Sequence, residues 1–199
     1  MKVNICYFSG TGNTAWAARK LAAFLEEGGM PATAVSIEGL SGTDAAALAE
    51  GRSHVFFGYP IYGSDVPEPM KDFLRGLPPL GLRVFGGFCT QEMFSGDGVR
   101  VMGHFLRASQ GGARIAYARH VWMPNNISIE KYGFKVERDP VKLTRIFDRA
   151  EAVLRKFAAD ILAGQEVRQG MNLGSRLLGL IQRGPFRLMY PWLMGCMSI

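Results

Sequence analysis

Cysteine is scarce in this sequence, and the placement of the few cysteines excludes several kinds of site. The 199 residues include Cys6, Cys89 and Cys196, with no Cys-x-x-Cys pair and no Cys/His cluster. A zinc site or an iron–sulfur cluster held by this chain alone is therefore not expected. Because Cys6 and Cys89 lie in apolar, strand-like stretches, we interpret them as unreactive core thiols in a reducing compartment.

Long apolar runs and blocks of basic residues are also missing. No stretch approaches the roughly 20 apolar residues that cross a bilayer, and the N-terminus has no signal-peptide core. We expect a cytoplasmic protein that is at most peripheral to a membrane. The net charge is +6, of which residues 166–199 carry +3 from four arginines and one glutamate. Since these charges form no basic block, nucleic acid is not an expected partner.

What the sequence does contain is a regular alternation of strand-like and helical segments. Hydrophobic residues make up 48% of the chain, which is enough for a full core. Strands are predicted over residues 2–8, 32–37, 53–59, 83–90 and 113–121. Helices are predicted over 44–49 and from starts near Thr14, Pro67, Asp97 and Asp139, with Ser95 or Asp97 as a cap. This pattern predicts an α/β fold with a doubly wound, five-stranded parallel sheet of order 2-1-3-4-5.

The loop between the first strand and the first helix is the clearest candidate for a ligand site. It consists of Ser9, Gly10, Thr11, Gly12, Asn13 and Thr14. Glycines let the backbone approach an anion closely, and the N–H groups at a helix start bind phosphate. The three hydroxyls add donors without adding charge. The loop lacks the lysine of a P-loop, so hydrolysis of a nucleoside triphosphate is not expected.

The same glycines leave a second ligand open. Gly10, Gly12 and Ala15 satisfy the pattern G-x-G-x-x-A, and Glu38 follows the second strand where a ribose-binding acid would stand. A dinucleotide such as NAD is therefore an alternative ligand. The density of hydroxyls in the loop weighs against a dinucleotide as the ligand.

Residues 9–14 resemble the flavodoxin motif for the phosphate of FMN, T/S-x-T-G-x-T. Residues 59–67, after the third strand, resemble the flavin-ring loop of that family. Their continuation, residues 68–74, is similar to the flavodoxin half of proteins that fuse this domain to a ferredoxin. Residues 90–98 stand where such proteins place their second ring-binding loop. The resemblance covers residues 1–165 and implies a flavodoxin-like, FMN-binding domain.

The resemblance also implies which side chains surround the isoalloxazine ring. They are Pro60, Ile61, Tyr62, Gly63, Thr90, Gln91, Phe94, Ser95 and Gly96. Tyr62 is the first choice for stacking on the ring, and Phe94 is the second. In flavodoxins a peptide at this place turns over when the flavin is reduced, and the resemblance carries this expectation to residues 62–64.

The function that the resemblance implies is electron transfer to or from a redox partner protein. An FMN-dependent NAD(P)H oxidoreductase of the quinone-reductase type is an alternative, and so is a non-redox binding module. His54, His104 and His120 are scattered over the predicted elements, so no catalytic side chain is expected. The chemistry would belong to the cofactor.

Residues 166–199 are predicted to be a separate C-terminal extension, basic and apolar. Leu173, Leu177, Leu180 and Ile181 recur at helical spacing and form an apolar stripe. Such a stripe is normally covered, so we expect it to pack on its own domain or on a dimer partner, with membrane-surface contact as the alternative. The extension has only Cys196, which departs from the pattern of ferredoxin-fused proteins.

Overall fold

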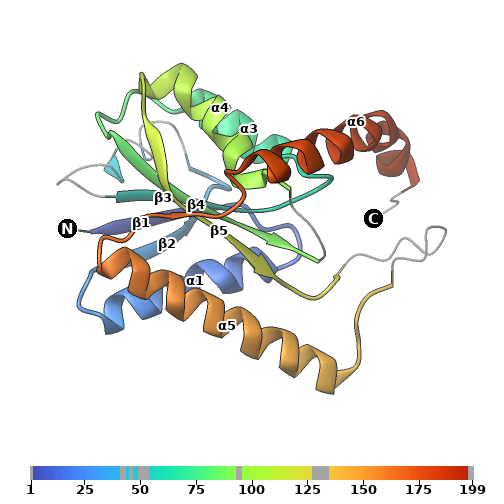
Figure 1. The fold of residues 1–199 in the computed structure, drawn as a ribbon, viewed down its shortest axis with the longest axis horizontal. Helices are drawn as coiled ribbons and strands as arrows, with labels where there is room; N and C mark the ends of the chain where they lie inside the picture. The colour runs from blue at the N-terminus through green and yellow to red at the C-terminus, as the bar shows by residue number, and fades with distance from the viewer. Residues whose placement is uncertain are drawn as a thin grey trace.

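The structure, a computed structural model, describes residues 2–40, 44, 47–48, 54–92, 96–126 and 135–196. Its centre is one parallel sheet with the strand order β2-β1-β3-β4-β5-β6 (Figure 1). The strands are β1 (Val3–Tyr7), β2 (Ala32–Ser36), β3 (His54–Pro60), β4 (Val84–Gln91), β5 (Arg114–Trp122) and β6 (Val167–Arg168). The predicted α/β class and the order of the first five strands are confirmed. The two-residue β6 is an addition that the sequence does not predict.

Helices cover both faces of the sheet. One face carries α1 and α5, and the other carries α3 and α4 (Figure 1). Their bounds are α1 (Asn13–Glu27), α3 (Glu68–Gly76), α4 (Gly98–Gln110) and α5 (Pro140–Leu162). The predicted start of α5 is confirmed, because the Asp139 carboxylate accepts hydrogen bonds from the N–H groups of Val141 and Lys142. The helix predicted over 44–49 lies largely outside the described residues.

Apolar side chains on both faces of the central strands divide the core into two clusters. Neighbouring Phe56 and Phe57 point to opposite faces, where Phe56 packs with Phe157 of α5 and Phe57 with Phe73 of α3. Cys6 is fully buried, and burial raises the pKa of its thiol to about 12. A protonated, buried thiol is unreactive. This agrees with the interpretation of Cys6 as a core residue.

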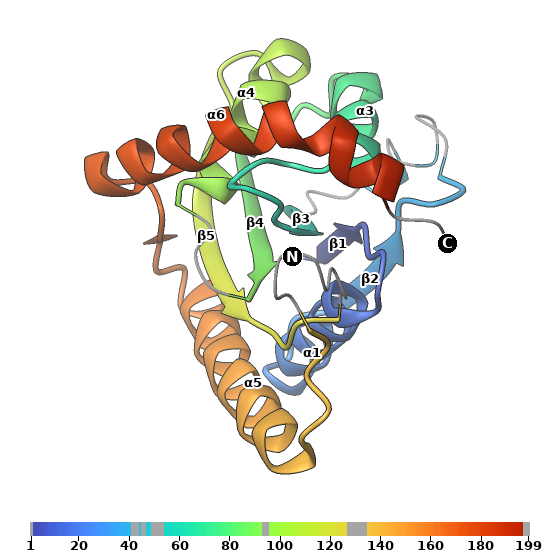
Figure 2. The same ribbon diagram turned by 90° about the vertical axis from the view of Figure 1, so that its right-hand side faces the viewer.

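The extension after α5 first adds a short strand to the edge of the sheet and then forms a long helix. β6 pairs with β5, and α6 (Leu173–Cys196) follows. α6 lies on the side of α3 and α4 and runs over the loops that follow β3 and β4 (Figure 2). The boundary proposed at residue 165 stays a prediction, with β6 directly after it in the sheet.

The apolar stripe of α6 faces outward. Its exposed fractions are 68% for Leu173, 54% for Leu177, 54% for Leu180 and 70% for Ile181. The expectation that this stripe packs on its own domain is therefore wrong. The inward face instead presents Gly179 and polar side chains, because the helix passes too close to the buried Asp97 to place a large side chain there. No described helix combines the length and hydropathy that a membrane span requires.

Candidate functional site

The carboxyl ends of the strands bring several loops to one edge of the sheet. β1 has β2 on one side and β3 on the other, so the winding of the sheet reverses at the loop that follows β1. In open α/β sheets, this reversal opens a crevice in which ligands bind. The loops after β3, β4 and β5 end at the same edge. The sequence-predicted site residues that the structure describes lie in or beside these loops.

The first loop is open toward solvent. Gly10, Thr11 and Gly12 are exposed, and Gly12 directly precedes α1 with a φ of 94°. No atom lies within 4 Å of the place where a β-carbon on Gly12 would stand. The first N–H groups of a helix have no acceptor within that helix. An anion above Gly12 could therefore accept hydrogen bonds from them without steric hindrance.

Two hydroxyl groups of this loop, those of Ser9 and Thr14, make hydrogen bonds within the protein. The Ser9 hydroxyl accepts a hydrogen bond from the N–H of Ala15 at 3.1 Å, which leaves its own hydrogen available as a donor. The Thr14 hydroxyl is buried and lies 2.8 Å from the hydroxyl of Thr90, at the end of β4. This bond joins the start of α1 to β4. Two predicted segments, far apart in the chain, thus meet at the site.

The segment after β5 also reaches the first loop, which the sequence analysis does not predict. Asn126 donates through Nδ2 to the carbonyl of Thr11 at 3.3 Å and to Oδ1 of Asn13 at 3.0 Å. Asn13 in turn donates to the carbonyl of Pro124 at 2.8 Å. The available signal was the position of residues 123–126 after the fifth strand, since parallel strands end at a common edge.

The loop after β3 turns back on itself at Tyr62. The N–H of Tyr62 lies 3.4 Å from the carbonyl of Asp65, and the reverse hydrogen bond is 3.0 Å long. Gly63 and Ser64 have φ values of 55° and 60°, which define a type I′ turn. The Tyr62 hydroxyl lies 3.8 Å from the place of a β-carbon on Gly10. Tyr62 therefore bridges the loops after β1 and β3.

The other predicted ring residues fall into two groups. Pro60 ends β3 opposite Thr90, and the N–H of Ile61 donates to the carbonyl of Thr90 at 2.9 Å. The Ile61 side chain packs against Gly98 at the start of α4. These contacts hold the two loops together at their base.

Further along β4, Gln91 is buried at the end of the strand, opposite Trp122. Gly96 has a φ of 48°. A β-carbon on Gly96 would stand 2.7 Å from the backbone of Gly179 in α6, so the two glycines lie against each other. Phe94 and Ser95 lie outside the described residues, so their predicted roles stay predictions.

The side chain of Asp97 has a different partner from the one predicted. It makes no capping bond to α4, although Asp97 directly precedes that helix. Instead the fully buried carboxylate pairs with the guanidinium of Arg183 from α6 and lies 3.3 Å from Arg100. Unpaired buried charges are costly, so two arginines at one carboxylate stabilise this arrangement. Arg183 also donates to the carbonyl of Ser64 at 2.9 Å, which ties α6 to both ring loops.

His120 lies beneath the start of the extension. Its ring abuts Gly170, and the backbone N–H of His120 donates to Oε1 of Gln169 at 3.0 Å. Burial, the largest cause, and nearby Arg119 together lower the pKa of His120 to about 4, while Asp97 opposes the shift. The ring is therefore neutral at pH 7. It serves packing between β5 and the extension rather than proton transfer near neutrality.

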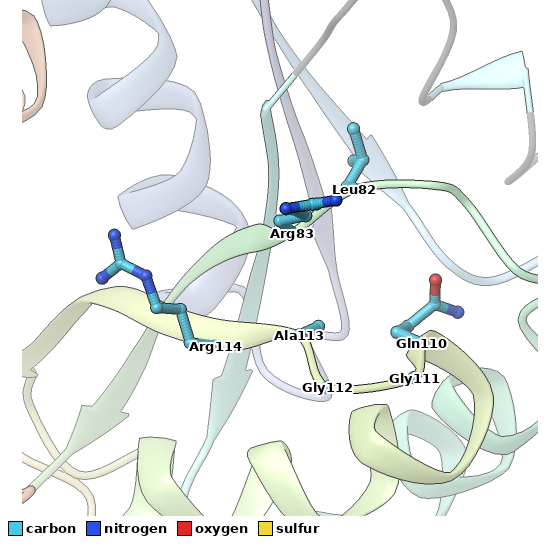
Figure 3. A pocket seen from close by; sticks show the side chains of 7 residues that line it. All are labelled: Leu82, Arg83, Gln110, Gly111, Gly112, Ala113 and Arg114. Atoms are coloured by element: carbon cyan, nitrogen blue, oxygen red, sulfur yellow. The ribbon is translucent and has the colours of Figure 1, made fainter.

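A separate hollow of about 410 Å³ lies at the opposite edge of the sheet (Figure 3). Arg83 and Arg114 line it from the starts of β4 and β5, and Gln110 lines it from the end of α4. Gln110 is engaged in structure, because its amide bonds the N–H of Leu80 and the carbonyl of Pro78. Since the hollow faces away from the carboxyl ends of the strands, we do not assign the site to it.

The strand order bears on the dinucleotide alternative. A dinucleotide-binding sheet has the order 3-2-1-4-5-6, in which β3 lies beyond β2. Here β3 pairs with β1 on the side opposite β2. Glu38 is exposed and accepts a hydrogen bond from Ser36 at 3.2 Å. The arrangement favours a mononucleotide over NAD.

Comparison with known proteins gives a consistent picture. No family model matches the chain. A flavodoxin from Nitratidesulfovibrio vulgaris (strain DSM 19637 / Miyazaki F) is 39% identical over 73 residues, which are 37% of this chain and 47% of that protein. A short-chain flavodoxin associated with a non-canonical PDU bacterial microcompartment superposes with a TM-score of 0.54 at 17% identity, over 82% of this chain and 99% of that one. The chain therefore has a flavodoxin-like fold.

A second solved structure, the two-electron reduced flavodoxin of Megasphaera elsdenii, matches this flavodoxin-like fold with a TM-score of 0.53 and 20% identity. The match covers 79% of this chain and 98% of the Megasphaera elsdenii chain. At such identities the likeness concerns the fold. The flavodoxin-like chain spans about half the length of the curated relative that it matches. Its similarity to the flavodoxin half of ferredoxin-fused proteins stays a prediction.

Proposed function

We propose that this flavodoxin-like protein binds FMN and transfers electrons to or from a redox partner. One observation carries the proposal: the open, uncharged loop of donors at residues 9–14 lies beside the turn at Tyr62, at the reversal point of the sheet. A phosphate group and a flat aromatic ring attached to it need such a pair of neighbouring subsites. The curated flavodoxin relative supports the same assignment.

The phosphate would lie above Gly12. Donors would come from the first N–H groups of α1 and from the hydroxyls of Ser9, Thr11 and Thr14. The dipole of α1 adds a positive potential at this end. The loop itself contains no charged side chain, so selectivity for phosphate would come from the number and direction of donors.

The isoalloxazine ring would lie between the loop after β3 and the loop after β4. Tyr62 is half-buried and so offers part of its ring as an apolar face. Gly63 permits the positive φ of the turn and keeps its backbone free of a side chain. Thr90, Gln91 and Gly96 would border the other side, together with the predicted Phe94 and Ser95. Bound FMN supplies one- and two-electron chemistry, while these residues bind it, orient it and exclude water.

The charge of the chain and the requirement for a second redox centre indicate what kind of partner would bind. Electron transfer requires a second redox protein that approaches the exposed edge of the site, and the basic balance of the chain favours an acidic one. Contact of the outward face of α6 with a second copy or with a membrane surface stays a prediction.

Titration of FMN with the purified protein tests the proposal. We expect quenching of FMN fluorescence at micromolar protein. Riboflavin, which lacks the phosphate, should bind about 100-fold more weakly, because at least two charge-assisted hydrogen bonds are lost. Equal affinities for the two ligands would contradict the role of residues 9–14. Absence of quenching would leave only a non-redox binding module.

Anaerobic addition of NADPH to the loaded protein separates the carrier from the oxidoreductase. A carrier should keep its oxidised spectrum over minutes and be reduced by dithionite. Rapid bleaching by NADPH would identify the FMN-dependent NAD(P)H oxidoreductase instead.

A further inference from the structure

The turn at residues 62–65 is held in an unfavourable backbone form. Within the described part of the chain, Ser64 is the one non-glycine residue with positive φ, at 60°. Serine has a β-carbon that crowds the backbone in this region, so a conformation of this kind persists only where the surroundings impose it. The residue before it, Gly63, meets no such restriction.

The surroundings that impose it belong to α6. Ser64 is fully buried, and its hydroxyl donates to Oε1 of Gln182. Its carbonyl accepts a hydrogen bond from Nη1 of Arg183 at 2.9 Å. Adjacent residues of one helix thus hold the side chain and the backbone of Ser64 at the same time.

Arg183 is itself fixed. Both of its terminal nitrogens face the carboxylate of Asp97, which is completely buried at the end of the loop after β4. Close approach is possible because α6 has a glycine, Gly179, directly against Asp97. The guanidinium therefore connects the loop after β3 to the loop after β4 through a rigid pair of contacts.

Turn stereochemistry supplies the alternative form. Types I′ and II′ both need positive φ at the first central position, here Gly63, but only type I′ needs it at the second, here Ser64. Rotation of the peptide between Gly63 and Ser64 converts one form into the other. It also exchanges the carbonyl and N–H groups that this peptide presents to either side. Without α6, Ser64 would favour type II′.

We propose that Gln182 and Arg183 are positioning residues, which hold the 62–65 turn in the type I′ form and so fix the dipole of the Gly63–Ser64 peptide at the redox site. The consequence for redox potential rests on the proposed function, since the turn borders the subsite assigned to the flavin ring. The conformational part stands on the contacts of the chain alone.

The conformation is measured on the protein without cofactor. In isotope-labelled wild type, NMR should show a strong nuclear Overhauser effect between the amide protons of Gly63 and Ser64, as type I′ requires. In Arg183→Gln and Gln182→Leu, the strong contact should move to the Gly63 α-protons and the Ser64 amide proton, as type II′ requires. Arg183→Lys keeps a donor and should retain the wild-type pattern. Arg176→Gln, at an exposed position of the same helix, is the matched control.

The potential is measured on the FMN-loaded protein. Arg183→Gln should change the ratio of dissociation constants for oxidised and fully reduced FMN about tenfold, which is about 30 mV for the two-electron couple. Arg176→Gln and Arg183→Lys should leave that ratio unchanged. If the wild type binds no FMN, the proposed function fails, and the proton contacts still decide the positioning role. If Arg183→Gln lowers only the melting temperature and alters neither the contacts nor the ratio, the inference is overturned. Should Arg183→Gln fail to fold, Gln182→Leu provides the same two readouts.

Discussion

The loop at residues 9–14 and the turn at residues 62–65 lie at the same edge of the sheet but are held by different means. The backbone of the first follows from its neighbours in the chain, because a strand ends, a glycine turns the backbone and a helix begins, while Thr90 and Asn126 add side-chain bonds from a distance. The second depends on Gln182 and Arg183, which are more than 100 positions away. The backbone of the 9–14 loop can thus be set locally, whereas the 62–65 turn needs a distant helix.

The largest effect is expected at Gly12, where the loop depends on its own backbone. Gly12→Val places a β-branched residue at a φ of 94° and should raise the dissociation constant for FMN about 10–100-fold, from strain of roughly 1–3 kcal/mol. Fluorescence titration measures this change. Gly29→Val is the matched control, because Gly29 has a φ of 82°, equally open surroundings and a place at the far end of α1. Equal losses of affinity in both variants would show that general instability is the cause.

Removal of the Thr14 hydroxyl tests how firmly the first loop is tied to β4. Thr14→Val leaves the buried Thr90 hydroxyl without this partner and should lower the free energy of unfolding by about 1–3 kcal/mol. Urea denaturation measures the loss, and the double variant with Thr90→Val should recover part of it. The control is Thr144→Val, since the Thr144 hydroxyl bonds the carbonyl of Pro140 in an exposed helix turn. A comparable loss at Thr144 would contradict the importance of burial.

Acidic pH should lower the free energy of unfolding through protonation of His120. Its pKa in the folded protein is about 4, below the ordinary value of 6.5, so the unfolded chain binds the extra proton between these values. The stabilising contribution is therefore complete above pH 6.5 and is lost as pH falls toward 4. From pH 7 to pH 5, His120 should lower the free energy of unfolding by about 2 kcal/mol. Urea denaturation at the two pH values measures this loss, and His120→Gln should lack it; an unchanged pH dependence in that variant would assign the effect to another group.

The smallest effect is expected on the outward face of α6. Ile181 is 70% exposed, so Ile181→Ser should change the free energy of unfolding by less than about 0.5 kcal/mol. Gly179→Ala, two residues away, puts a methyl group against the Asp97 carboxylate and should lower it by about 1–3 kcal/mol. Thermal denaturation of both variants compares the two faces. A large loss in Ile181→Ser would mean that the outward face is covered in solution, and light scattering would then show whether a second copy covers it.

The same contrast explains what the sequence could predict. The individual strands and the start of α5 follow from periodicity and local capping, which act over a few residues. The strand order follows from the general rule for doubly wound sheets once the strands and helices are known to alternate. The side of α6 that packs inward could not be predicted, because the apolar stripe suggested burial of Leu177 and Leu180. Packing instead follows the shape and charge around Asp97, to which Gly179 and Arg183 are complementary. Such complementarity arises only once distant loops have met. The contact of Asn126 with Thr11 was missed for the same reason.

The place of α6 in the chain orders the events of biosynthesis. A ribosome makes β1 and the 9–14 loop before α6, which follows the five main strands in the chain. In a nascent chain, the 9–14 loop could thus be in place while the 62–65 turn still samples both of its forms. Adjustment of the 62–65 turn would then wait for α6, so that the two loops would acquire their final forms at different times.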